Sequence, residues 1–266
     1  MAFQLFPSSI YDTYPLNSLK ALPGYADLIV YSACFFHVIF LTGGLLSHYL
    51  SSHYRNLSSQ KKGGWCIHIV SFTFSCFAIY NGLKFTAIPE LIADPLFGVT
   101  DYTKQILAIS TGYFLWDTLI SITYVSESGV AMVLHGASCF TVFFLTFQPY
   151  THSFGKTFLL FEVSTIFLNI HWFCDKTGRS GSTLQWINGM CLLASFLFFR
   201  LIWGTYSMIE YIIIGYMARD QVAWFIYPLY ALCALTLGGL NFYWYSIMIR
   251  SVMSRFQNKD THKKVE

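Results

Sequence analysis

The chain has 266 residues and a formal net charge of +3; 55% of its residues are hydrophobic and 11% are charged. Soluble domains carry about 25% charged residues, so this composition excludes an ordinary soluble domain and indicates an integral membrane protein. The basic residues form no pattern typical of nucleic-acid binding, so we expect no nucleic-acid partner.

The first 25 residues do not resemble a cleaved signal peptide. They lack a basic start and a continuous apolar core, and Pro7, Pro15 and Pro23 interrupt them. A signal peptide needs both of the missing features. We therefore expect residues 1–25 to form a lumenal segment, followed by a first apolar helix that remains as an anchor.

Seven apolar segments follow, and each approaches the roughly 20 residues that a helix needs to cross a bilayer. They are residues 26–47, 65–84, 105–125, 130–147, 154–173, 184–207 and 222–249. The sixth could continue to residue 216, which would make it long, tilted or kinked. Because open strand edges are not tolerated in lipid, the expected fold is all-α, a polytopic membrane protein with seven transmembrane helices.

The basic residues between these segments predict an orientation. Ten of them fall on one side: Arg55, Lys61, Lys62, Lys176, Arg179, Arg250, Arg255, Lys259, Lys263 and Lys264. Five fall on the other: Lys20, Lys84, Lys104, Lys156 and Arg219. Cytosolic loops carry the excess of basic residues, so the N terminus is predicted to be lumenal and the C terminus cytosolic.

Two connecting segments bear on this topology. Residues 85–104, the longest loop, contain Pro89, Pro95 and Gly98, which predict a turn-rich segment lying over the bundle. The sequence Asn56–Ser58 matches a glycosylation acceptor, but the predicted topology places it in the cytosol, where it would not be used.

The chain ends in KKVE, with Lys263 and Lys264 at the fourth and third positions from the C terminus. This ending resembles the dilysine retrieval signal of endoplasmic-reticulum membrane proteins. Residues 256–266 are therefore expected to be a cytosolic tail whose dilysine-like end is recognised by a retrieval coat, and the protein is expected in the endoplasmic-reticulum membrane. The polar chain after Ser251 is expected to be mobile.

A few polar side chains interrupt the apolar spans. They are Asp117, His135, Glu162, Asn169, Arg200 and Asn241, with Glu210 added if the sixth helix is long. Ionisable groups cost several kcal/mol inside a bilayer, so they are candidates for function. We predict that they line one polar cavity that opens toward the cytosol.

The alternative is that these side chains only hold helices together. Glu162 and Arg200 could form a structural ion pair, whose net contribution to stability can be near zero. His135 could hydrogen-bond a neighbouring helix, a contact worth about 1 kcal/mol in membranes.

The order of several motifs resembles that of TLC-domain proteins. In chain order the motifs are WCIHIVSFTFSCFAIYNGL, ADPLFGVT, STGYFLWDTLI, LHGASCF, FLLFEVSTIFLNIHWF, FFRLIWGTY and LNFYWYSIMIRSVMSRF. The resemblance covers residues 60–255 and is nearer to the TLC domain-containing branch than to the ceramide synthases. It implies a six-helix bundle around a lipid-accessible cavity, with residues 26–59 adding one N-terminal helix and a cytosolic loop.

Ceramide synthases of this superfamily carry two adjacent histidines and downstream acidic residues, and they transfer a fatty acyl group from acyl-CoA to a sphingoid amine. His135 matches the first histidine, whereas Gly136 stands at the second. The resemblance therefore favours lipid binding over acyl transfer.

The leading hypothesis is a protein that binds a sphingolipid or phospholipid and influences membrane lipid composition, transport or sensing. In a second, His135 is the general base of an acyl-CoA-dependent N-acyltransferase, oriented by Asp117 or Glu162. A structural or chaperone-like role and a proton-coupled transporter stay open, although no inverted repeat supports the transporter. Acyl-CoA is expected only in the second hypothesis, as a co-substrate, and no cofactor is expected. No metal site is expected either, since the seven cysteines are scattered without a CxxC pair.

Overall fold

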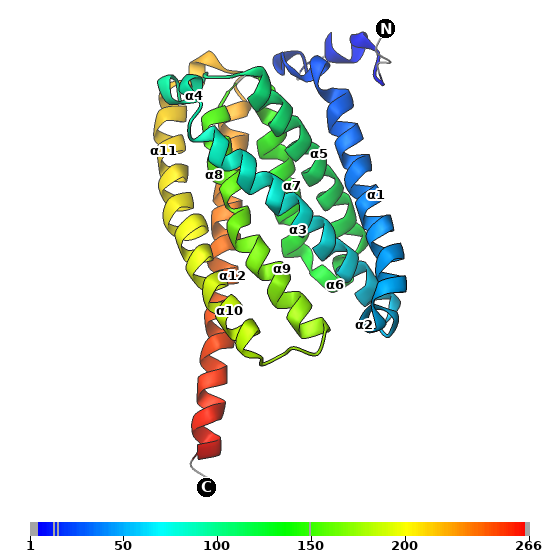
Figure 1. Cartoon of the computed structure of the whole chain (residues 1–266). Coiled ribbons are helices and arrows are strands. Elements are labelled where there is room, and N and C mark those ends of the chain that lie inside the picture. Colours follow the sequence, from blue (N-terminus) through cyan, green and yellow to red (C-terminus); the bar gives the residue numbers. More distant parts are fainter. Residues whose placement is uncertain (1–4, 13, 15, 149, 264–266) are drawn as a thin grey trace.

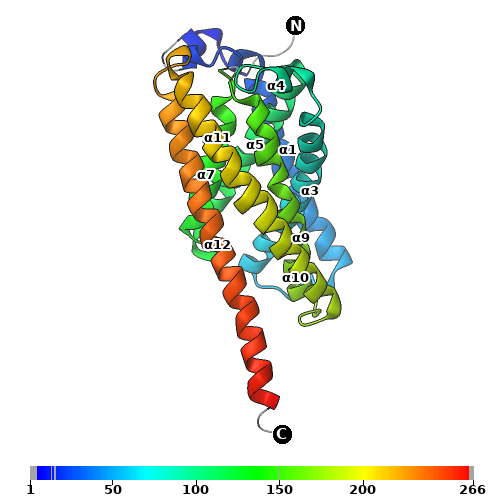
Figure 2. The same cartoon turned by 90° about the vertical axis from the view of Figure 1, so that its left-hand side faces the viewer.

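The computed structural model describes residues 5–12, 14, 16–148 and 150–263, and gives the backbone alone for residue 8 and residues 254–263. Throughout these residues the regular structure is helical, without strands, which confirms the all-α prediction. The longer helices pack side by side into one bundle (Figures 1 and 2).

Six helical stretches of the described chain are long and apolar enough to cross a membrane. They are α1 (Ala26–Leu50), α3 (Ser59–Phe85), α5 (Asp101–Thr123), the stretch His152–Lys176, the stretch Thr183–Met217 and the first part of α12 (Ile226–Lys263). The predicted fourth span is α7 (Val130–Leu145), an apolar helix of 16 residues. This helix ends at Leu145, whereas the predicted span ended at residue 147. At about 1.5 Å per residue, α7 is shorter than the hydrocarbon core of a bilayer.

Two other predicted spans differ from the structure. The predicted span 154–173 is two helices, α8 (Gly155–Leu160) and α9 (Glu162–Lys176), preceded by the short η4 (His152–Phe154). The predicted span 184–207 continues to Met217 as α10 (Thr183–Ser195), the π-helical η5 (Phe196–Trp203) and α11 (Gly204–Met217). Helix α12 continues through the predicted tail as far as Lys263.

The short elements lie at the two ends of the bundle. At the end near the N terminus are η1 (Ser8–Asp12), η2 (Leu16–Ser18), η3 (Leu22–Gly24), α4 (Pro89–Ala93) and η6 (Arg219–Gln221). At the other end are α2 (Ser52–Arg55) and α6 (Val125–Ser128). The two termini lie at opposite ends (Figure 1).

Helix α5 lies at the centre of the bundle and α1 at its edge. In the most apolar 18 residues of each helix, 67% of the residues of α5 are buried, compared with 17% of those of α1. The ring of Tyr113 on α5 stacks on Phe74 of α3 with centroids 3.6 Å apart and meets Phe36 of α1 edge-on. Ser32 of α1 also donates a hydrogen bond to the Ile109 carbonyl at 2.8 Å. The central helix therefore keeps its polar side chains Ser110, Thr111 and Asp117 buried.

The end that holds α4 is closed by packed loops. The backbone N–H of Thr151 donates to the Leu96 carbonyl at 2.6 Å, and that of Ala21 donates to the Phe147 carbonyl at 2.8 Å. Leu91 and Leu96 are buried beneath this cover. The loop 85–104 thus lies over the bundle, as its turn residues predicted.

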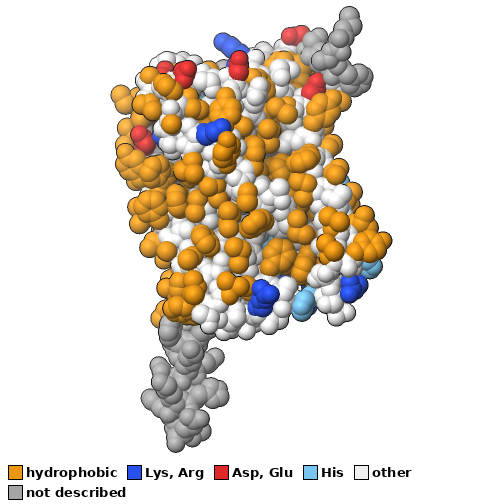
Figure 3. All heavy atoms as spheres, in the orientation of Figure 1, with side chains coloured by type: hydrophobic (Ala, Val, Ile, Leu, Met, Phe, Trp, Pro, Cys, Tyr) orange, Lys and Arg blue, Asp and Glu red, His pale blue; other side chains and the backbone are white. Residues whose placement is uncertain are grey.

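The sides of the bundle present apolar side chains. In Figure 3 hydrophobic side chains cover the middle of the visible face, while most charged groups gather toward its ends. Many large apolar residues are exposed there, such as Leu45 on α1, Leu119 on α5 and Leu232 on α12. Such a surface matches the hydrocarbon core of a bilayer.

Candidate functional site

A cavity of about 560 Å³ lies among α3, α5, α7, α9, η5 and α12. Its volume falls within the range of about 300–1,000 Å³ that is typical of small-molecule sites. The exposed residues Gln60, Lys61, Glu127 and Ser128 border it. These residues belong to the first turn of α3 and to α6, so the cavity opens at the end away from α4.

The cavity brings together five of the six intramembrane residues that the sequence singled out. Asp117, His135, Glu162, Asn169 and Arg200 all line it. Asn241 instead lines two small adjoining cavities, of about 30 and 10 Å³. Arg200 borders all three cavities and so lies where they meet.

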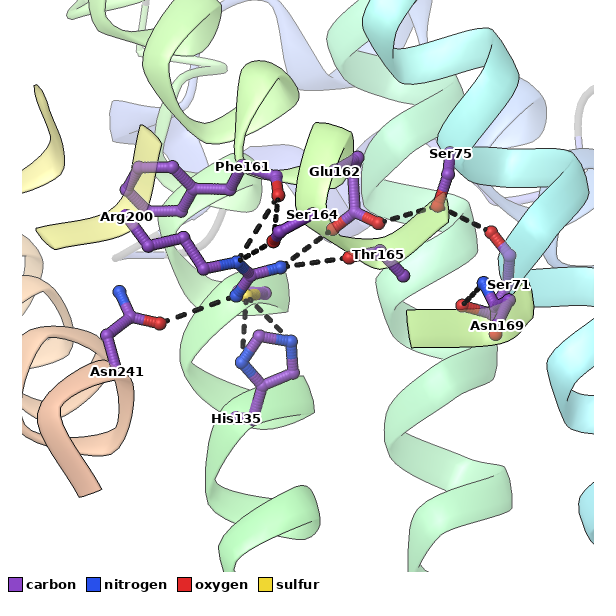
Figure 4. A network of polar contacts seen from close by, with 11 residues as sticks. Ser71, Ser75, His135, Phe161, Glu162, Ser164, Thr165, Asn169, Arg200 and Asn241 are labelled. Carbon is purple, nitrogen blue, oxygen red and sulfur yellow. Dashed lines mark hydrogen bonds and ion pairs between the residues drawn. The ribbon is translucent and has the colours of Figure 1, made fainter. Parts of the chain in front are cut away.

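Arg200 is the centre of a polar network (Figure 4). Its Nε donates to Ser164 Oγ at 3.0 Å and to the Phe161 carbonyl at 3.2 Å. Its Nη2 donates to Thr165 Oγ1 at 3.0 Å, and its Nη1 donates to Asn241 Oδ1 at 3.4 Å. The side chain is buried, so these contacts replace the water that the charge has lost.

The backbone supplies part of this network. The chain is helical on both sides of Phe161 but turns there, between α8 and α9. Arg200 lies within the π-helical η5, a wider form of helix that often occurs at functional sites. The break and the wide helix together bring the guanidinium against the Phe161 carbonyl.

Glu162 is the nearest anionic group to Arg200. Its Oε1 lies 3.7 Å from Arg200 Nη2, and its Oε2 accepts a hydrogen bond from Ser75 Oγ at 2.9 Å. Both members of the pair are buried. The ion pair that the sequence left open is therefore present, although its separation is longer than that of a direct hydrogen bond.

A second cluster on the cavity wall was missed in the sequence. His68 Nδ1 lies 2.6 Å from Asn169 Oδ1, and Asn169 Nδ2 donates to Ser71 Oγ at 3.1 Å. The His68 ring stacks on Trp172 with centroids 4.2 Å apart. His68, Ser71 and Ser75 are spaced i, i+3 and i+7, so a polar face of one helix was the available signal.

Asp117 and His135 face the cavity from α5 and α7. Asp117 is buried, and His135 lies edge-on to the rings of Phe114 and Trp244. The His135 ring lies 3.8–3.9 Å from Cys139 Sγ, which is a weak contact.

Gly136 allows α7 to approach α5 closely beside these residues. A Cβ at this position would lie 3.0 Å from Thr118 Oγ1 and 3.1 Å from Asp117 Oδ2. Larger side chains would therefore push the two helices apart. A glycine at position 136 therefore lets α5 and α7 pack closely, in addition to replacing the second histidine of a pair.

The remaining predicted residues lie elsewhere. Lys263 is the last described residue of α12, and Lys264 lies outside the described residues. The sixth helical stretch is the longer of the two predicted alternatives, so it includes Glu210, which lies in α11 and is half-buried. Among the described residues no group of His, Cys, Asp or Glu is placed to hold a metal ion.

Comparison with known proteins identifies related chains. The TLC domain family matches residues 64–250. An uncharacterised TLC domain-containing protein of Schizosaccharomyces pombe is 35% identical over 239 residues, which cover 89% of this chain and 82% of that protein. TLC domain-containing protein 4-B of Xenopus laevis is 29% identical over 65% of this chain and 68% of its own length.

A more distant relative carries a different kind of name. Topoisomerase I damage affected protein 4 of Saccharomyces cerevisiae is 26% identical over 172 residues, which cover 61% of this chain and 62% of that protein. No solved structure matches the chain.

Proposed function

The chain belongs to the TLC domain family, and on that basis we propose that it binds a membrane lipid in the cavity between its helices. Through this binding it influences membrane lipid composition, transport or sensing. The lipid head lies against Asp117, His135, Glu162, Asn169 and Arg200, while Asn241 acts through Arg200.

The observation that carries this proposal is the cavity itself. Its volume is about 560 Å³, and its wall combines these buried polar groups with an apolar surface that suits an acyl chain. The apolar part comprises Phe114, Leu168, Leu192, Phe196, Ile247 and Met248. Bundle proteins commonly place ligands between their helices in such mixed surroundings.

The packing of Gly136 supports lipid binding over N-acyl transfer from acyl-CoA. In the acyltransferase reading His135 is the general base, and the histidine beside it would stand at position 136. A Cβ there lies 3.0–3.1 Å from Thr118 and Asp117, so the present spacing of α5 and α7 leaves no room for an imidazole.

Mass spectrometry of lipids that co-purify with the protein tests the proposal. Gly64 lines the cavity, and a Cβ there would meet Trp172 at an ordinary 3.6 Å, so Gly64→Leu should fill part of the cavity without a backbone clash. Gly239→Leu is the matched control, because that position on α12 faces open space.

We expect one lipid class to be enriched with the wild type and with Gly239→Leu, and to be reduced at least about fivefold with Gly64→Leu, a loss of about 1 kcal/mol in binding. Equal lipid content in all three proteins would contradict the proposal, provided that Gly64→Leu keeps the unfolding temperature of the wild type.

The proposed location is the endoplasmic-reticulum membrane, with the N terminus lumenal and the C terminus cytosolic. The ten-to-five distribution of basic residues supports this orientation. In this arrangement Lys263 and Lys264 are available to a retrieval coat, and the cavity opens toward the cytosol.

A further inference from the structure

We propose that the cavity selects a lipid whose polar head donates hydrogen bonds, through ammonium or hydroxyl groups, over one with a phosphate or carboxylate head. This inference rests on the proposed lipid binding and adds the chemistry of the head group. It follows from the donors and acceptors that the cavity wall leaves unused.

Arg200, the side chain best suited to hold a phosphate, already has protein partners for three of its five N–H groups. Each of its three nitrogens donates to a protein oxygen: Nε to Ser164 and Phe161, Nη2 to Thr165, and Nη1 to Asn241. The Glu162 carboxylate adds an opposite charge at 3.7 Å. One N–H on each Nη has no hydrogen-bond partner among the described residues, but an anionic head that approached it would meet the Glu162 carboxylate.

His68 presents an acceptor to the cavity. The Asn169 amide is oriented by its own donation to Ser71, so its Oδ1 faces His68 Nδ1 at 2.6 Å. An amide oxygen only accepts, which means that Nδ1 carries the proton and Nε2 of the neutral ring keeps its lone pair. No residue in the described part of the chain donates to that Nε2.

Asp117 is a second acceptor in need of a donor. Its side chain is buried on the cavity wall, yet none of the described residues donates a hydrogen bond to its carboxylate. A buried carboxylate without donors is costly, so a ligand that supplies N–H or O–H groups gains the compensation. A phosphate head would add negative charge beside Asp117 and Glu162.

Apart from the buried Arg200, the cationic groups of the cavity lie toward its mouth. Lys61 is exposed in the first turn of α3, and Lys176 ends α9 with its ammonium 5.3 Å from the centre of the Trp172 ring. The deeper neutral donors include the hydroxyl of Tyr113 and the indole of Trp244. Arg200 pairs with Glu162, and no cation among the described residues lies within ion-pair distance of Asp117.

Three single-chain probes of equal tail length test the inference on the full chain in detergent: dodecylamine, 1,2-dodecanediol and dodecyl phosphate. We expect the amine or the diol to bind the wild type at least about tenfold more tightly than the phosphate, a difference of about 1.4 kcal/mol. The amine and diol arms distinguish an ammonium head from a hydroxyl head.

Asp117→Asn keeps the shape of the side chain while removing its charge, and it should weaken the preferred probe about tenfold while leaving dodecyl phosphate unchanged or tighter. Glu90→Gln, at an exposed position of α4 at the closed end of the bundle, is the matched control and should preserve the ranking. If Asp117→Asn does not fold, the order of the three probe affinities for the wild-type protein still tests the inference.

Phosphate binding that equals or exceeds that of the other probes would overturn the inference. If Gly64→Leu also abolishes that phosphate binding, the cavity remains a lipid site and only its selectivity is wrong. An Asp117→Asn protein that folds and keeps the wild-type ranking would also overturn the inference. Binding of none of the three probes would overturn the inference together with the proposed function.

Discussion

At the scale of single residues, Arg200 and Glu162 depend on each other. Both are buried, and removing one partner of such a pair leaves an uncompensated charge in a low-dielectric site. Replacing both by neutral groups avoids that penalty. The network around them therefore tolerates paired changes better than single ones.

We predict that Arg200→Met lowers the free energy of unfolding by about 3–5 kcal/mol. The double variant Arg200→Met with Glu162→Gln should recover at least half of that loss, because no unpaired charge remains. Thermal unfolding of the purified proteins in one detergent measures both. A double variant that is less stable than Arg200→Met alone would contradict the coupling.

The charged residues of the site were predictable from the sequence, because a formal charge within an apolar span is conspicuous. Asp117, Glu162 and Arg200 were found in this way. His68 was not, since it lies three residues inside the predicted start of its span and was easily taken as interfacial. Its role depends on Asn169, 101 positions away, which only the folded chain brings near.

At the scale of helices, the contact between α5 and α7 sets the width of the cavity. Gly136 lies at this contact, where a Cβ would approach Thr118 and Asp117 at 3.0–3.1 Å. The side-chain atoms there must move by a few tenths of an ångström to admit a methyl group. An added side chain would therefore strain the helix pair.

Gly136→Ala should lower the free energy of unfolding by about 1–2 kcal/mol, as overpacking does. Gly239→Ala on lipid-facing α12 has open space and should instead be neutral or stabilise by up to about 1 kcal/mol, because alanine favours a helix. Thermal unfolding of the two variants side by side gives the comparison. Equal shifts of the unfolding temperature in the two variants would show that α5 and α7 are not tightly packed at Gly136.

Most helices were predictable to within a few residues from apolar runs, but two irregular features were not. The turn at Phe161 and the π-helical η5 both serve Arg200, because the Phe161 carbonyl accepts from the guanidinium that η5 carries. Local apolarity continues through both segments, so no composition change marks them. Tertiary contacts decide these features.

At the scale of the whole molecule, the two ends of the bundle differ. Packed loops lie over the end with α4 (Figures 1 and 2). The cavity opens at the other end. In the proposed orientation the closed end is lumenal. A ligand would then enter from the cytosolic side.

The orientation predicts that Asn56 carries no glycan and that an epitope tag after Glu266 is digested by protease added to sealed microsomes. A glycan acceptor introduced in the loop 86–88 should, in contrast, be modified. Replacing Lys263 and Lys264 by serine should move the protein beyond the endoplasmic reticulum in fluorescence microscopy. A glycan on Asn56 would reverse the assigned orientation.

The most direct test of lipid binding is an experimental density map of the protein purified from its native membrane, at a resolution that shows side chains. We expect elongated density in the cavity, with its polar end within hydrogen-bond distance of Asp117 and His68 and its tail along Leu168, Phe196 and Ile247. A cavity that holds only water, or that its own side chains have filled, would contradict the claim that this protein binds a lipid there.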